Sequence, residues 1–81
     1  MTIHSTQAAW RVVGGNGRHM TCEIQVVRDM QNELTFEAHV LYEGNLLHIG
    51  SYASLAEAER EAEDVLIELQ DAGWRVQTSV D

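Results

Sequence analysis

The sequence has 81 residues, an apolar fraction of 44% and a formal net charge of −8 at pH 7. A chain of this length holds one domain, and its apolar content is that of a globular protein rather than a disordered one. Its positive charge comes from five arginines, without any lysine. Phosphate groups therefore repel the chain, which disfavours direct binding to nucleic acid or to an anionic membrane.

The first residues lack the basic and apolar pattern of a signal peptide, and no apolar run has the ~18 residues that span a bilayer. The single cysteine, Cys22, cannot form a disulfide within the chain. These features predict a cytoplasmic protein without a membrane anchor. A small core without a disulfide gives a thin margin of stability, which favours a partner or a second copy of the chain.

Residues 1–7 show no periodicity, so we expect a flexible N-terminal tail followed by a single domain over residues 8–81. Residues 8–13 read as a strand that ends at the turn signal Gly14-Gly15-Asn16-Gly17. Apolar residues then alternate with polar ones over residues 20–26 and again over residues 34–42. Residues 46–52 form the fourth predicted strand.

The turns between these strands predict which residues pair. A three-residue loop at Gly15-Asn16-Gly17 and a two-residue type II′ turn at Gly44-Asn45 would each join two antiparallel strands. Together they predict four apolar pairs on the inner face of the sheet: Trp10–Cys22, Val12–Met20, Val40–Ile49 and Tyr42–Leu47. Agreement between turn length and alternation favours a four-stranded meander.

One amphipathic helix is predicted over residues 54–73. Ser54 and Glu57 make a capping box at its start, and Gly73 is a left-handed stop at its end. Residues 74–80 alternate again as a last strand, which would run antiparallel to the first and lie beside it. The sequence therefore predicts a single α+β domain, ββββαβ, whose antiparallel sheet of four to five strands has the helix on one face.

Acidic residues form a ridge along this helix. At about 100° per residue, the five members fall within roughly 80° of one another over a length of about 21 Å. The acidic ridge consists of Glu57, Glu61, Asp64, Glu68 and Asp71. Like charges four residues apart cost a few tenths of a kcal/mol each, and lysine would be favoured near the helix end.

The acidic ridge has two interpretations. It is either the solvated face of a helix, or the docking surface of a non-enzymatic protein that binds a basic partner protein. Its carboxylates, about 6 Å apart, also approximate the spacing of phosphates along a nucleic-acid strand. That spacing suggests an alternative: a phage- or plasmid-type inhibitor that mimics nucleic acid, of the anti-restriction, anti-CRISPR or antitoxin kind.

Residues suited to catalysis or metal binding are few. His39 and His48 are expected diagonally across the outer face of the sheet with Glu23 opposite His39, and two histidines with a carboxylate could bind a metal. Cys22 alternates with apolar residues and is expected to be a buried structural thiol. No nucleophile has a histidine partner in register, so we expect neither an enzyme nor a cofactor.

The outer face of the sheet offers a second candidate surface. Its expected apolar residues are Val27, Leu41 and Leu46, which would support a homodimer formed through the sheet face or its edges.

The eleven-residue run His48-Ile49-Gly50-Ser51-Tyr52-Ala53-Ser54-Leu55-Ala56-Glu57-Ala58 resembles the strand-to-helix junction of AP2-type and integrase arm-binding domains. The resemblance implies a small sheet backed by one helix. It also implies a DNA-binding sheet, which in those families is basic. Here the corresponding strands carry glutamates and histidines.

Overall fold

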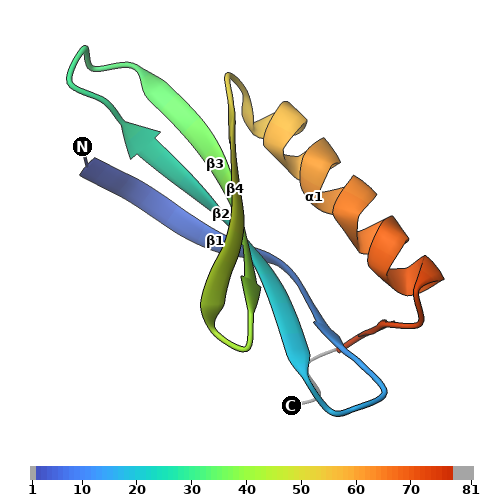
Figure 1. Ribbon diagram of the computed structural model, residues 1–81. Helices are drawn as coiled ribbons and strands as arrows, with labels where there is room; N and C mark the ends of the chain where they lie inside the picture. Colours follow the sequence, from blue (N-terminus) through green and yellow to red (C-terminus); the bar gives the residue numbers. More distant parts are fainter. Residues whose placement is uncertain (1, 78–81) are drawn as a thin grey trace.

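The computed structural model of the chain describes residues 2–77, and the side chains of residues 5–77. Its elements follow the order β1 (Thr2–Val13), β2 (His19–Arg28), β3 (Leu34–Tyr42), β4 (Asn45–Tyr52), α1 (Leu55–Asp71) and β5 (Arg75–Val76). The strands form one antiparallel sheet in the order β4-β3-β2-β1-β5, with α1 packed against one face (Figure 1). This arrangement confirms the predicted ββββαβ fold and strand order.

The core lies between α1 and the inner face of the sheet. The helix contributes Ala58 and Ala62, whose small side chains let it approach the strands closely. The indole Nε1 of Trp10 donates a hydrogen bond of 2.7 Å to the Ala62 carbonyl oxygen, which joins β1 to the middle of the helix. The buried cluster comprises Trp10, Val12, Met20, Cys22, Ile24, Ala38, Val40, Ala58 and Ala62.

The hairpin between β1 and β2 has the predicted register. The Gly14 N–H donates to the Arg18 carbonyl oxygen over 2.8 Å, which closes a three-residue loop. Gly17 within that loop has φ of +80°, a conformation that favours glycine. Trp10 pairs with Cys22 and Val12 with Met20, all four buried in the core.

The hairpin between β3 and β4 does not have the predicted register. The turn is Glu43-Gly44, with φ of +50° and +83°, and not Gly44-Asn45. Two positive φ values match a type I′ turn, whose twist suits the twist of the flanking strands. Tyr42 therefore pairs with Asn45, and a bulge follows at Leu47.

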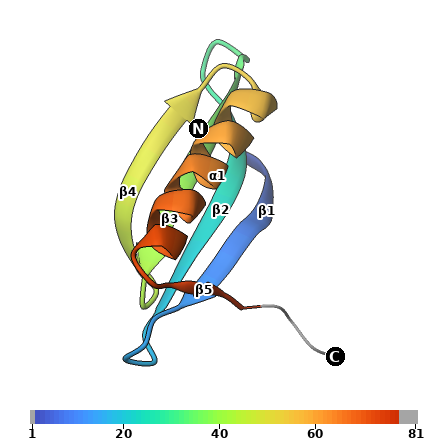
Figure 2. The same ribbon diagram turned by 90° about the vertical axis from the view of Figure 1, so that its right-hand side faces the viewer.

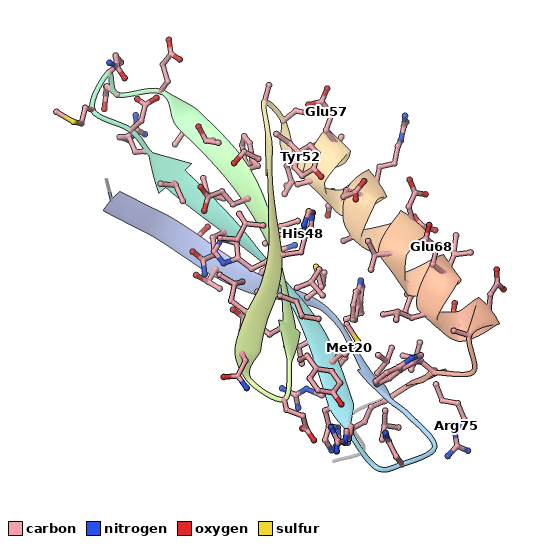
Figure 3. The ribbon with its side chains drawn as sticks, viewed as in Figure 1. Met20, His48, Tyr52, Glu57, Glu68 and Arg75 are labelled. Carbon is pink, nitrogen blue, oxygen red and sulfur yellow. The ribbon has the colours of Figure 1, made fainter. Side chains whose placement is uncertain are left out.

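The bulge reverses the faces of β4 that were predicted from alternation. Val40 pairs with His48 and not with Ile49, so His48 lies on the helix side of the sheet (Figure 3). Ile49 instead pairs with His39 on the outer face and is 45% exposed. The predicted inner pairs Val40–Ile49 and Tyr42–Leu47 are therefore wrong, because one extra residue turns the following side chains to the opposite face.

The N-terminal segment is also more regular than predicted. Residues 2–7, expected to be a flexible tail, belong to β1 and pair with the second half of β2. Register shifts between Ile3 and Ser5 and between Ala8 and Trp10 interrupt the ladder. These shifts break the period of two, so the sequence shows no alternation where the backbone is nevertheless paired.

Both ends of the helix follow the predicted capping signals. The Ser54 Oγ accepts a hydrogen bond of 3.2 Å from the Glu57 N–H, and the Glu57 carboxylate accepts one from the Ala53 N–H. At the other end Gly73, with φ of +101°, permits a hydrogen bond from the Trp74 N–H to the Leu69 carbonyl oxygen.

The last predicted strand is described only in part. Its described part covers Arg75–Val76, which pair with Val13 and Val12, while the predicted strand residues Thr78 and Val80 lie outside the described residues. Within residues 2–77, no helix has the length and apolar character needed to cross a membrane.

Candidate functional site

The acidic ridge lies along the side of α1 that does not face the core. Ala58 and Ala62 fix the rotation of the helix against the sheet, and this rotation leaves four ridge residues exposed and Glu61 half-buried. Figure 3 shows Glu57 at the first turn of the helix and Glu68 near its far end, pointing away from the sheet. The ridge is therefore a continuous, accessible line of carboxylates.

Within residues 2–77, the ridge carboxylates form no ion pair. Over the part of the chain that the structure describes, the one ion pair joins the His39 Nε2 and Glu37 Oε1 atoms, 2.9 Å apart on the outer face of the sheet. The last turn of α1 contains no basic residue, so Glu68 and Asp71 stand at the negative end of the helix dipole without compensation. Only Glu57 has a local structural role, as the helix cap.

The ridge is on the β4 side of the helix. Burial raises the pKa of the Tyr52 hydroxyl on β4, and the nearby charge of Glu61 raises it further. Glu61 is the most buried member of the ridge. The opposite flank of the helix carries Glu59 and Glu63, which face β1. Acidic side chains thus follow both flanks of α1.

A groove between α1 and β1 was not predicted from the sequence. It has a volume of about 330 Å³, an apolar floor and two glutamates at its rim. The small residues Ala8 and Ala9 on β1, opposite Ala62 on α1, leave this space unfilled, and their occurrence together is the sequence signal that could have indicated it. The lining residues are Gln7, Ala8, Ala9, Trp10, Ile24, Glu59, Ala62, Glu63 and Leu66.

The structure separates the residues considered for a metal site. Glu23 pairs with His39 across β2 and β3, as predicted. His48, however, lies on the opposite face of the sheet from His39, because of the bulge at Leu47. Among residues 2–77, no three or more histidine, cysteine or acidic side chains are grouped as a metal ion requires.

The three residues proposed for the outer sheet face also differ in position. Leu41 and Leu46 pair directly across β3 and β4, and Leu46 is 53% exposed. Val27 is only 2% exposed, so it is not available to a partner. The expectation that Val27 offers an exposed apolar side chain to a partner is therefore wrong.

Cys22 is buried in the core, as predicted. Burial raises the pKa of its thiol to about 11, and the nearby charges of Glu23 and Glu61 act in the same direction. The thiol therefore stays protonated at neutral pH, and a protonated thiol is a poor nucleophile.

Comparison with known proteins gives no relative: no protein family, no curated protein and no solved structure matches this chain.

Proposed function

We propose that this protein is a non-enzymatic interaction protein whose acidic ridge binds a basic surface on another protein. The observation that carries the proposal is the row of five carboxylates along one side of the helix, four of them exposed and none of them in an ion pair within the described residues. A basic partner would supply the missing cations as charge-assisted hydrogen bonds.

The cost of the ridge to the helix supports the proposal. Like charges at positions i and i+4 are repulsive, and acidic residues in the last turn oppose the helix dipole. Glu61 and Glu68 each have an acidic neighbour three or four residues away. The one arginine of the helix, Arg60, forms no ion pair with Glu57 or Asp64 in the described residues. Such an arrangement loses stability in the free protein and regains it when a cationic surface binds.

The rigidity of the support also favours this role. The helix is capped at both ends and is joined to the sheet through the Trp10–Ala62 hydrogen bond. A charged row on a fixed helix loses little conformational freedom when it binds, which lowers the free-energy cost of association.

The test compares the wild type with a ridge variant that keeps Glu57, because its carboxylate caps the helix. The ridge variant carries Glu61→Gln, Asp64→Asn, Glu68→Gln and Asp71→Asn. A control variant removes the same charge elsewhere on the surface, through Glu33→Gln, Glu43→Gln, Glu59→Gln and Glu63→Gln, all exposed in the structure.

Each protein is immobilised and exposed to lysate of the source cells, and the affinity of each captured protein is then measured. We expect a basic protein to bind the wild type and the control variant, and to bind the ridge variant at least about tenfold more weakly. Added salt should weaken the binding, because the Debye length is only about 8 Å at physiological ionic strength. Equal capture by the ridge variant, or no capture by the wild type, would contradict the proposal.

A second candidate partner is a nucleic-acid-binding protein. The ridge steps by about 6 Å for each i, i+4 pair, comparable to the spacing of phosphates on one strand. This alternative makes the protein an inhibitor that occupies a phosphate-binding site. Under it, duplex DNA or RNA in excess should displace the captured partner from the ridge, and displacement should fail if the partner uses another basic surface.

A further inference from the structure

Strand β4 forms one border of the sheet, and its outer side is open. Figure 2 shows β4 at the edge and α1 over the middle of the sheet, without any described element beyond β4. An edge strand presents a row of unpaired N–H and C=O groups that another strand can pair with. At about 3.3 Å per residue, the eight residues of β4 offer an edge roughly 26 Å long.

Large apolar side chains gather at this edge. Leu46, Leu47 and Ile49 are 53%, 61% and 45% exposed. The bulge at Leu47 adds Ile49 to this group, because it turns Ile49 out of the core position that alternation alone would give it. Three exposed large apolar residues within four positions of one short strand exceed the isolated exposed residues that are normal on protein surfaces.

Apart from the bulge at Leu47, the edge lacks the devices that natural edge strands use for protection. Lysine, proline and inward-pointing charges keep exposed edges from pairing with other chains. Each of the other described strands has at least one charged residue, as with Arg11 in β1, Glu37 in β3 and Arg75 in β5, whereas β4 has none. The chain has neither lysine nor proline.

We propose that β4 pairs antiparallel with β4 of a second copy of this chain, across a two-fold axis, to form a continuous sheet. Self-complementarity favours a second copy as the partner, and the charge distribution leaves this edge open to it. Two chains with a net charge of −8 repel each other at most surfaces, and the uncharged β4 edge is where they can approach. An antiparallel pair is self-complementary, because each strand supplies the same donors and acceptors to the other.

The other edge of the sheet does not fit a second copy as well. There β5 already covers β1 at Val12 and Val13, and the groove beside the rest of β1 is rimmed by Glu59 and Glu63. Two such edges would bring four glutamates together. The proposal therefore concerns β4, and it holds whether or not the acidic ridge has a partner.

The dimer should be weak and should respond to salt. An edge of eight residues with three apolar side chains is smaller than the interfaces of stable complexes, which bury about 1,600 Å². Dilution should therefore dissociate it. Added salt screens the repulsion between the two chains and should strengthen the dimer, whereas it should weaken binding of a basic partner to the ridge.

The test is sedimentation velocity of the wild type and of three single variants over a wide range of protein concentration and salt. Leu47→Lys and Ile49→Lys place a cation at the edge without filling or emptying the core. Ile67→Lys is the matched control, because Ile67 is 49% exposed and lies on the helix, away from β4. Circular dichroism of each variant checks that the fold is retained.

We expect the wild type and Ile67→Lys to dimerise with rising concentration and salt. Leu47→Lys and Ile49→Lys should raise the dissociation constant by about tenfold or more, since each removes apolar contacts at both sides of the two-fold axis. In the wild type, hydrogen exchange of the β4 amides should slow as concentration rises. A wild type that stays monomeric throughout, or a loss of dimer with Ile67→Lys equal to that with Leu47→Lys, would overturn the proposal.

Discussion

The two hairpins of the sheet, β1–β2 and β3–β4, follow the same apolar alternation but differ in how their turns set the register. In β1–β2 the Gly15-Asn16-Gly17 loop places every expected apolar pair in the core. In β3–β4 the turn falls one residue earlier than expected, at Glu43-Gly44, and a bulge at Leu47 takes up the difference.

This difference shows that alternation predicts which strands pair but not always which residues do. A hairpin with a single suitable turn has one register. Where two adjacent pairs of residues could form the turn, the one whose twist suits the strands is favoured, and a bulge absorbs the extra residue. The consequence here is an exposed, uncharged edge on one hairpin and a buried core on the other.

The largest expected effect is the loss of stability when Trp10 is truncated. The same truncation of Ile49, the residue predicted to be in the core of the other hairpin, provides the comparison. Trp10→Ala should lower the free energy of unfolding by about 3–5 kcal/mol, because the indole is buried and hydrogen-bonded to Ala62. Ile49→Ala should cost less than about 1 kcal/mol, because Ile49 is largely exposed. Urea unfolding followed by circular dichroism measures both.

A comparable loss of stability in the two variants would mean that Ile49 is in the core, and that the bulge at Leu47 is absent. Trp10→Phe is the control for shape: it keeps an aromatic ring in the core and loses the hydrogen bond to Ala62.

A smaller effect is expected from pH, through Cys22 in the β1–β2 hairpin. The thiol ionises near pH 9 in the unfolded chain, but its pKa in the folded protein is raised to about 11. Above pH 9 the folded state therefore keeps a proton that the unfolded state has lost, so stability falls as pH rises from about 9 to 11. The slope from this group is at most about 1.4 kcal/mol per pH unit.

Stability curves of the wild type and Cys22→Ala between pH 7 and the alkaline range, measured by urea unfolding, test this linkage. The variant has a lower baseline because it leaves a small cavity, but its stability should fall less steeply above pH 9. Parallel curves for the two proteins would contradict a raised pKa at Cys22.

The smallest effect concerns the turn of the β3–β4 hairpin and has the opposite sign. Glu43 has φ of +50°, which is unfavourable for glutamate, whereas Asn-Gly is the preferred pair for a type I′ turn. Glu43→Asn should therefore raise the free energy of unfolding by about 0.5–1 kcal/mol. Glu33→Asn removes the same charge from an exposed loop residue without a positive φ and is the control. Destabilisation by Glu43→Asn would favour the Gly44-Asn45 turn.

Much of the fold could be predicted because its signals are local. The capping residues Ser54 and Gly73 define the helix, and the alternation over residues 20–26 and 34–42 defines the two central strands. What could not be predicted lies at the three register shifts, in β1 and β4. A bulge inserts one extra residue and so reverses the faces of the side chains that follow it. The alternation of apolar and polar residues does not indicate where that residue is inserted.

The candidate site follows the same division. The positions of the ridge residues depend only on helix geometry and on the apolar stripe that faces the core, so the exposure of Asp64 and Glu68 could be predicted. The relation between His39 and His48 depended on the register of β4, and it was wrong for that reason. The groove beside β1 depended on empty space between two elements, which no sequence pattern records directly.

The hydrogen bond between Trp10 and Ala62 also has an optical consequence. The Trp10 indole lies at the contact between helix and sheet, with its N–H fixed 2.7 Å from a helix carbonyl. The other tryptophan, Trp74, is half-buried beside Gly14 at the end of the first hairpin. With Trp74→Phe, the emission of Trp10 alone would report separation of the helix from the sheet, so that docking of the helix could be timed during folding without any added dye.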